Sequence, residues 1–245
     1  MMKRRRKFDW RFLVFCLLYA LLGFAFIFMI LSLATFTTIF NRGFFEWQQE
    51  INNTIDAVNV SAADLELLTT KIMRYFFGLD ESLQTFVTFL NNPGTLAPFY
   101  TVDELSHMAD VKVFFDIIKW CGILLPFAIG AALFFIIKYD KDALRRLSAG
   151  ALVVSILILI IIIPIGIGLA VDFDAAFEMF HTILFPQGNY QFGFDSHMLA
   201  MLHESLFYTA AVIIFVPTVI SIVGLTAFGI TGVTISIKRR TKSQH

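Results

Sequence analysis

Two short stretches of the sequence combine histidine with carboxylates at helical spacing. Glu104, His107 and Asp110 recur at every third position in the first stretch, and Glu178 and His181 have the same spacing in the second. Side chains three positions apart lie on one face of a helix. Histidine exchanges protons near neutral pH, and a nearby carboxylate can fix the tautomer and orientation of its ring. Both stretches therefore predict helix faces suited to acid–base chemistry.

A metal centre is the main alternative chemistry for these residues. Glu104 and His107 have the Glu-x-x-His spacing of metal sites in helical bundles, and Asp174 lies one helical turn before Glu178 as a further possible ligand. The chain has neither a His-Glu-x-x-His motif nor a close cysteine–histidine pair. We therefore predict no metal and no cofactor. Gly-x-Ser-x-Gly, the common setting of a serine nucleophile, is also absent.

The elements that carry these residues are typical of an integral membrane protein. Apolar residues make up 58% of the 245 positions, and mean hydropathy is +0.75. Soluble domains have about 45–50% apolar residues, so an ordinary soluble enzyme is excluded. A helix needs about 20 apolar residues to cross a hydrocarbon core of ~30 Å. Four runs are long enough and predict transmembrane helices at about 12–40, 113–137, 149–171 and 205–237.

The first apolar run follows a cluster of basic residues, as the apolar part of a secretory signal peptide does. At 12–40, however, it is about twice the length of such a segment, and no small-residue cleavage site follows it. We therefore expect a retained helix. The two cysteines, Cys16 and Cys121, both lie in apolar runs, so neither a disulfide framework nor a zinc ribbon is expected.

The distribution of charge predicts the orientation of these helices. Residues 1–11, 138–148 and 238–245 together carry fourteen Lys or Arg and three acidic residues, a net charge of +11. The rest of the chain has a net charge of −11. Because cytoplasmic loops are enriched in Lys and Arg, both termini are expected in the cytoplasm. Segments 41–112 and 172–204 are then extracellular. The orientation of the helices already explains the short basic segments, which give no indication of nucleic-acid binding.

The first extracellular segment contains signals for helices. Ser61 and Asp64 have the types and spacing of a helix start, and Gly78 is a suitable end. A second amphipathic piece is expected at 83–90, before the turn-forming residues 91–94. The segment is interpreted either as a small helical cap packed on the bundle or as a lid that lies on the outer leaflet and admits lipid. The two interpretations do not exclude each other.

A second helix start predicts how the first histidine is held. Thr101 and Glu104 form a Thr-x-x-Glu capping box, so a helix is expected to begin near Val102 and to continue into the second span. Asp116 and Lys119, three positions apart on that helix, are expected to form an ion pair. The predicted fold is thus all-α: one membrane domain, 1–245, with four transmembrane helices and a mostly helical extracellular cap.

The two histidine stretches also resemble the motifs of a known family. Residues 100–116 read YTVDELSHMADVKVFFD, residues 173–185 read FDAAFEMFHTILF, and Gly188, Asn189 and Tyr190 follow. These segments resemble the motifs of the lipoprotein intramolecular transacylases of Gram-positive bacteria. The number, order and spacing of the spans match that family over nearly the whole chain.

The resemblance implies a reaction. The substrate would be a lipoprotein whose N-terminal cysteine carries an S-linked diacylglyceryl group and a free α-amino group. The enzyme would move the sn-2 acyl chain to that amine and leave a lyso-form lipoprotein. The implied location is the bacterial plasma membrane with an extracellular active site, where diacylglyceryl-modified lipoproteins and membrane lipid are the partners; the oligomeric state stays open.

The expected site residues follow from the motifs and this reaction together. His107 and His181 are expected to act as general base and general acid, in an order that the sequence leaves open. Supporting roles are expected for Glu104, Asp110 and Glu178, which would orient the histidines, and for Asn189 or Tyr190, which would donate to the oxyanion. Two other classes stay open from the residues alone: a metal-dependent membrane hydrolase, which a chelator would inhibit, and a non-enzymatic membrane accessory protein, which would tolerate loss of both histidines.

Overall fold

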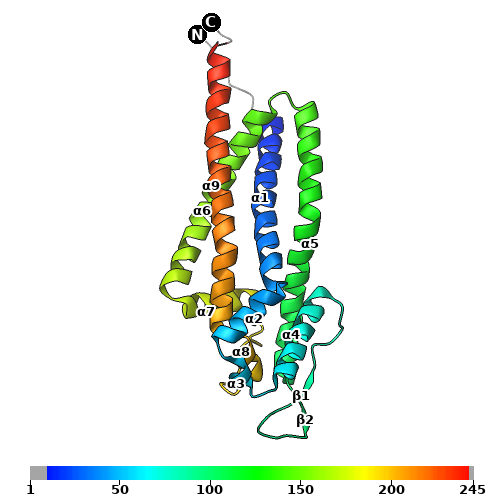
Figure 1. The fold of residues 1–245 in the computed structure, drawn as a ribbon. Coiled ribbons are helices and arrows are strands. Elements are labelled where there is room, and N and C mark those ends of the chain that lie inside the picture. The colour runs from blue at the N-terminus through cyan, green and yellow to red at the C-terminus, as the bar shows by residue number, and fades with distance from the viewer. Residues whose placement is uncertain (1–9, 243–245) are drawn as a thin grey trace. The chain divides into compact units, whose positions relative to one another are not determined.

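The computed structural model describes residues 10–242, and within them four long apolar helices dominate (Figure 1). Each of the four is long and apolar enough to cross a membrane, which confirms the predicted number and order of spans. Most of the basic segment 1–11 lies outside the described residues. The four helices are α1 (Trp10–Ile39), α5 (Val102–Tyr139), α6 (Ala143–Val171) and α9 (Glu204–Lys242).

Helix α5 begins well before its most apolar part, as the capping box predicts. The Glu104 carboxylate accepts a hydrogen bond from the Thr101 backbone N–H at 2.8 Å, and Thr101 Oγ1 accepts one from the Glu104 N–H at 3.2 Å. The helix then continues unbroken for 38 residues, roughly 57 Å at 1.5 Å per residue. That length exceeds the ~30 Å of a hydrocarbon core. His107 therefore belongs to the same continuous helix as the second predicted span.

The third span ends differently. Helix α6 stops at Val171, and α7 (Phe173–Leu184) begins after a single extended residue, Asp172. The Asp172 carboxylate accepts a hydrogen bond from the Ala175 N–H at 3.0 Å, so it caps the new helix. Asp172 still donates its backbone N–H to the Gly168 carbonyl at 2.9 Å, but its extended backbone (φ −150°, ψ 90°) ends α6 and lets the chain change direction at this residue. Glu178 and His181 still share one helix, although it is not a continuation of α6.

The chain divides into two compact units. The first unit comprises Met1–Leu31, Ile123–Pro164 and Pro217–His245, and thus contains part of each long helix. In it, the Tyr19 hydroxyl of α1 donates to Asp140, which also pairs with Arg146 of α6 at 3.1 Å. Helices α1 and α6 approach closely at Gly150, where a Cβ would lie 2.8 Å from the Tyr19 carbonyl carbon. The expectation of a single membrane domain stays a prediction.

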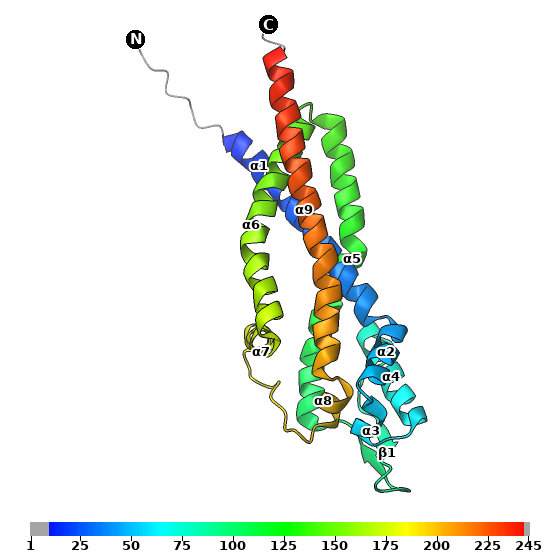
Figure 2. The ribbon, with the colours of Figure 1, turned by 60° about the vertical axis from the view of Figure 1, so that its left-hand side comes forward.

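The second unit comprises Ser32–Gly122 and Ile165–Val216, and it contains both histidine stretches. Its extramembrane part is built from α2 (Arg42–Ile51), α3 (Thr54–Val58), α4 (Ala62–Phe77) and α8 (His197–Met201). Helices α2, α3 and α4 lie together with strand β1 (Phe86–Thr88) in Figure 2. Their shared apolar core includes the fully buried side chains of Val58, Leu68, Val87, Tyr100 and Met201. The predicted mostly helical cap is therefore present.

The amphipathic piece at 83–90 is not helical. Strand β1 (Phe86–Thr88) pairs antiparallel with β2 (Leu96–Pro98), with Val87 opposite Ala97. The buried side chains in this segment are Leu83, Thr85 and Val87, and this alternation has the period of a strand. The helical interpretation was wrong here because the same short pattern also fits a half-buried strand.

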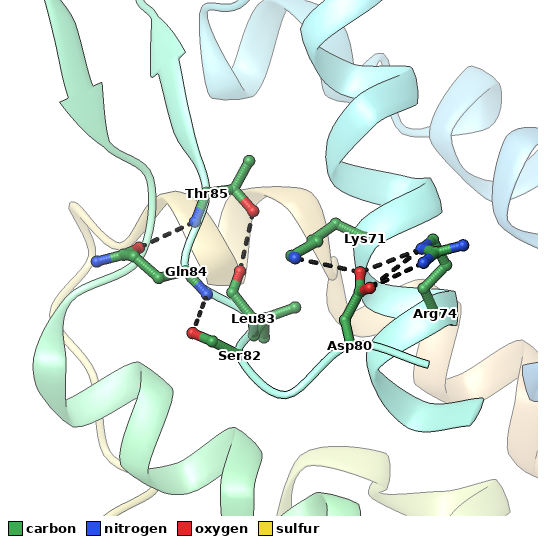
Figure 3. Close-up of polar contacts among 7 residues, drawn as sticks. All are labelled: Lys71, Arg74, Asp80, Ser82, Leu83, Gln84 and Thr85. Atoms are coloured by element: carbon green, nitrogen blue, oxygen red, sulfur yellow. Dashed lines mark hydrogen bonds and ion pairs between the residues drawn. The ribbon is translucent and has the colours of Figure 1, made fainter. Parts of the chain in front are cut away.

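Ion pairs hold the connection between α4 and β1 (Figure 3). The Asp80 carboxylate lies 2.9 Å from Arg74 Nη2 and 3.1 Å from Lys71 Nζ, both on α4. These hydrogen-bonded cations, with Arg74 contributing most, lower the pKa of Asp80. Helix α4 begins at the predicted cap, where Ser61 Oγ accepts a hydrogen bond from the Asp64 N–H at 3.1 Å, and it ends before Gly78. Both predicted ends of this helix are confirmed.

Candidate active site

The two histidines of the sequence motifs lie side by side in the second unit. The imidazole rings of His107 on α5 and His181 on α7 have centroids 5.9 Å apart, with an angle of 32° between their planes. They are 74 positions apart in the sequence, so the fold rather than local spacing brings them together. Two imidazoles at this distance cannot both be protonated without repulsion. The pair is thus suited to hold one proton and pass it on.

Aromatic side chains surround the histidine pair. Phe185 contacts the His107 ring with a centroid distance of 4.8 Å, and Phe177 contacts the His181 ring at 4.1 Å. Phe192 also packs on His107, and the ring of Tyr190 lies 5.1 Å from that of His181. Only 6% of His107 is exposed. The apolar walls shield His107 from water and strengthen the electrostatic interactions of groups beside it.

The hydrogen bond of His181 defines its tautomer. Its Nδ1 lies 2.8 Å from the backbone carbonyl oxygen of Phe177, one turn earlier in α7. A carbonyl oxygen can only accept, so Nδ1 carries the hydrogen and Nε2 of the neutral ring holds the free lone pair. Burial lowers the pKa of His181, although the bond to Phe177 and the charge of Glu178 act in the opposite direction. His181 is therefore favoured as a neutral ring that can accept a proton at Nε2.

The loop after α7 connects the two histidine helices. Gly188 has a φ of +76°, a conformation that favours glycine, and it reverses the chain before Asn189 and Tyr190. Asn189 Nδ2 donates to Asp110 Oδ2 of α5 at 2.8 Å. The Tyr190 hydroxyl instead donates to Glu178 Oε1 of α7 at 3.4 Å. The carboxylates predicted beside the histidines thus bind this loop.

Asp110 receives a second amide from the same loop. Gln187 Nε2 donates to Asp110 Oδ2 at 2.8 Å, the same oxygen and distance as for Asn189. A carboxylate only accepts hydrogen bonds, so it is the amide nitrogen of Asn189 that faces Asp110, and Asn189 Oδ1 points away from Asp110. The Asn189 side chain reaches the His107 ring. Asp110 therefore holds the loop residue Asn189 beside His107.

Glu104 occupies a different position from the other expected site residues. It is 1% exposed, and its carboxylate accepts hydrogen bonds from the Thr101 backbone and from the Ser196 hydroxyl. Ser196 also caps α8 by accepting from the Leu199 N–H at 3.0 Å. Glu104 therefore joins the start of α5 to the start of α8. The fold brings together six of the seven expected residues and leaves Glu104 one turn away from the pair.

The expected ion pair is found below the histidine on α5. Asp116 Oδ1 lies 2.5 Å from Lys119 Nζ, and Asp116 Oδ2 lies 3.0 Å from Lys112 Nζ, a second and unpredicted partner. Lys119 also donates to the Phe77 carbonyl at the end of α4, at 3.3 Å. These contacts join α4 to α5. Among the contacts of the described residues, none joins this ion-pair group to His107 or His181.

Several other contributors were not predicted. Phe185 and Phe192 form part of the walls, and Gln187 and Ser196 hold the loop and α8 in place. Phe185 ends the second motif and was a possible signal, whereas no local pattern marks Gln187 as a partner of Asp110. Within residues 10–242, no group of three or more His, Cys, Asp or Glu side chains has an arrangement that could hold a metal ion.

The outer face of α7 is apolar and uncovered. Met179 and Ile183 are 53% and 68% exposed, and Phe180 on the same helix is also exposed. The helix buries no residue completely. His181 is therefore part of a helix whose opposite face is free to contact lipid.

Four apolar helices and a histidine pair with aromatic walls define a multi-pass integral membrane protein whose paired imidazoles are suited to proton transfer. The family model of the lipoprotein intramolecular transacylase Lit matches residues 20–208, which is most of the chain. The chain belongs to this family. It is accordingly an acyltransferase, a membrane lipoprotein transacylase, as the motifs predicted.

Solved structures of a transacylase have the same fold. The membrane-integral lipoprotein intramolecular transacylase Lit from Bacillus cereus is 19% identical to the chain, with a TM-score of 0.61, and the match covers 92% of this chain and 98% of that protein. A structure of the same enzyme with one histidine replaced by alanine has 18% identity, a TM-score of 0.59 and coverage of 92% and 96%. No curated protein matches the chain.

Proposed function

We propose that the chain transfers the sn-2 acyl chain of an S-diacylglyceryl-cysteine lipoprotein to the α-amino group of the same cysteine. The product is a lyso-form lipoprotein with an N-acylated terminus. The observation that carries this proposal is the pair of imidazole rings, 5.9 Å apart between aromatic walls. An apolar site with two proton-exchanging groups suits an ester that carries acyl chains and an amine that must lose a proton.

The reaction needs one net proton movement. The amine nitrogen forms a bond to the sn-2 carbonyl carbon, and the bond from that carbon to the glycerol oxygen breaks. The nitrogen loses a proton, and the glycerol oxygen gains one. The amine has a pKa near 7.7–8.0 and must be neutral to attack. His107 and His181 act as the base and acid of this exchange, in an order that we leave unassigned.

Both reacting groups belong to one substrate molecule. A well-oriented intramolecular reaction gains an effective concentration of about 10⁵–10⁸ M, so positioning supplies much of the acceleration. The amine is itself the nucleophile, and the proposal accordingly requires no serine or cysteine of the protein. The oxyanion formed during attack needs hydrogen-bond donors. The second amide hydrogen of Asn189 and the hydroxyl of Tyr190 are the candidates beside the pair.

We also propose that the site faces the extracellular side. The support is the charge asymmetry, because the segments that contain the site residues are acidic and the opposite segments are basic. Single cysteines at Thr95, in the exposed β1–β2 turn, and at Lys141, between α5 and α6, test this in a variant without Cys16 and Cys121. A membrane-impermeant maleimide added to intact cells should label Thr95→Cys and leave Lys141→Cys unlabelled. The reverse pattern would contradict the orientation.

Mass spectrometry of a lipoprotein's N-terminal tryptic lipopeptide tests the reaction. The host should make only the diacylglyceryl form with a free amine, and it should express the wild-type chain, His107→Ala or His181→Ala. With the wild-type chain, the total mass of the lipopeptide should be unchanged. Its fragment masses should show one acyl chain on the cysteine nitrogen instead of on the glycerol. Each histidine variant should lower the transfer rate by about 10²–10⁴-fold.

His203→Ala is the matched control. His203 is exposed, and its Nδ1 bonds with Ser205 rather than with a site residue. This variant should retain transfer. If the lipopeptide loses the mass of one acyl chain when the wild-type chain is expressed, the enzyme is a hydrolase. If both His107→Ala and His181→Ala keep wild-type turnover, the assignment of these two residues is wrong.

A further inference from the structure

Two buried polar atoms beside the catalytic pair lack an aligned hydrogen-bond partner. They are His107 Nδ1 and Asn189 Oδ1, and in the described part of the chain only Ser32 Oγ shares this property. Leaving a buried donor or acceptor unpaired is costly, so such atoms need an explanation. The Asn189 side chain nevertheless reaches the His107 ring. A small movement would pair a potential N–H donor with a carbonyl acceptor.

The orientation of Asn189 is determined by its other contact. Asp110 Oδ2 accepts from Asn189 Nδ2 at 2.8 Å, and it accepts from Gln187 at the same distance. If the amide were turned over, two acceptor oxygens would face each other. Asn189 Oδ1 must therefore point away from Asp110, and it can serve His107 only as an acceptor.

We propose that Asp110, Asn189 and His107 form a hydrogen-bond relay in which Asn189 Oδ1 accepts the Nδ1 hydrogen of His107. Asp110 holds the amide, the amide fixes the imidazole tautomer, and His107 Nε2 is left free to exchange a proton with the substrate. Asp110 and Asn189 are thus positioning residues for His107. The proton-exchange role of His107 in this relay rests on the proposed function, whereas the hydrogen bonds of the relay do not.

The second histidine supports the relay by analogy within the same site. His181 Nδ1 donates to a carbonyl oxygen, that of Phe177, and its Nε2 is free. The relay gives His107 the same arrangement with a side-chain carbonyl in place of a backbone carbonyl. Two rings 5.9 Å apart would then both present Nε2 for proton exchange. The charged or titratable groups around His107 are His181 on α7 and Asp110 on its own helix.

Nitrogen-15 NMR of the histidine rings in the full-length protein tests the relay directly, because the two neutral tautomers give different nitrogen shifts. His107→Ala identifies the His107 signals. We expect neutral His107 to carry its hydrogen on Nδ1 in the wild-type protein and to lose this preference in Asn189→Leu. The matched control is Gln187→Leu, which removes one bond to Asp110 but leaves Asn189 in place. Its His107 tautomer should not change.

Kinetics give a second readout. Asn189→Leu should lower kcat by about 10–100-fold, as does removing a group that orients a metal-bound histidine, with little change in KM. Asn189→Asp keeps an acceptor beside His107 but adds a negative charge, so the acid limb of its pH–rate profile should move to higher pH. An Asn189 side chain that does not contact His107 would move that limb little.

The outcomes separate the relay from the proposed reaction. If His107 carries its hydrogen on Nε2, or if Asn189→Leu leaves the tautomer unchanged, the relay is wrong whatever the enzyme catalyses. If no transacylation occurs but the tautomer changes as expected, the relay stands and the proposed reaction fails. Unaltered His181 signals in each variant show that the site has kept its fold.

Discussion

Asn189 and Tyr190 are adjacent in the sequence, yet their side chains bind carboxylates on different helices. Asn189 donates to Asp110 of α5, and Tyr190 donates to Glu178 of α7. The peptide between them therefore joins the helix of His107 to the helix of His181. The distance between the two rings depends on this short connection as well as on the packing of the helices.

Removing the Tyr190 hydroxyl should weaken this connection while the aromatic ring beside His181 stays in place. The hydroxyl lies 3.0 Å from Thr182 Oγ1 and 3.4 Å from Glu178 Oε1, and its ring packs on His181. Tyr190→Phe keeps the ring and loses bonds of about 0.5–1.5 kcal/mol each. We expect kcat to fall by roughly threefold to tenfold, because these hydrogen bonds are lost.

The control is Thr182→Val, which removes the bond between Thr182 and the Tyr190 hydroxyl but keeps the hydroxyl itself. A loss of about 10²-fold or more in Tyr190→Phe would instead identify the hydroxyl as an oxyanion donor.

The pH dependence of turnover should depend on Glu178. Burial lowers the pKa of His181, so its ring stays neutral below pH 6.5, and the His181 limb of the kcat profile should lie at lower pH than the limb of the substrate amine at about 7.7–8.0. Glu178 raises the pKa of His181 by its negative charge. Glu178→Gln should therefore move the His181 limb further toward low pH. Glu50→Gln, an exposed carboxylate on α2, is the control, and an upward movement in Glu178→Gln would contradict this account.

Glu104 should be more important for stability than for the chemical step. Its buried carboxylate serves the Thr101 backbone and the Ser196 hydroxyl, and hydrogen bonds to charged groups contribute about 1.5–3 kcal/mol each. Glu104→Gln should lower the Tm of the purified protein by several degrees. Asp103→Asn, one position earlier and exposed, should change it little. If Ser196→Ala is added to Glu104→Gln, the losses should be less than additive because the two residues share one bond.

Asp80 should contribute stability only while it is ionised. Its ion pairs with Arg74 and Lys71 lower its pKa relative to the unfolded chain. The unfolded chain then binds the proton more readily, so this stabilisation is complete above pH ~4 and is lost as the pH falls through the lower pKa of the folded state. Asp80→Asn should reduce Tm at pH 7, and the difference should narrow with acidification. Glu81→Gln is the neighbouring control; a difference that is constant with pH would exclude the ion pairs as its cause.

Local signals predicted the helix ends well. The capping box at Thr101 and Glu104 and the cap at Ser61 form as expected because each needs only residues within one turn. The spans were also predictable, since length and hydropathy suffice. The strand pair was missed because its partner segments are separated by a turn whose pairing no short pattern reveals.

The histidine motifs located the two rings that lie side by side, but not the residues that support them. Asn189 and Asp110 are 79 positions apart, and their bond depends on where the loop after α7 returns. The same applies to Ser196, which meets Glu104 across 92 positions. Helical spacing suggested that Glu104 would orient His107, whereas the capping box already assigned its carboxylate to the helix start, and its second partner, Ser196, was not predictable from any local pattern. Contacts of this kind require the fold.

The uncovered apolar face of α7 has a consequence for handling the purified protein. Met179 and Ile183 project from the helix that carries His181, so in solution they will be coated by whichever detergent is used. Solubilisation thus changes the surroundings of the helix that carries His181. Rates measured in micelles of different chain length, or in nanodiscs, compare different environments of α7. Substrate preferences should therefore be determined in one amphiphile and then repeated in a bilayer.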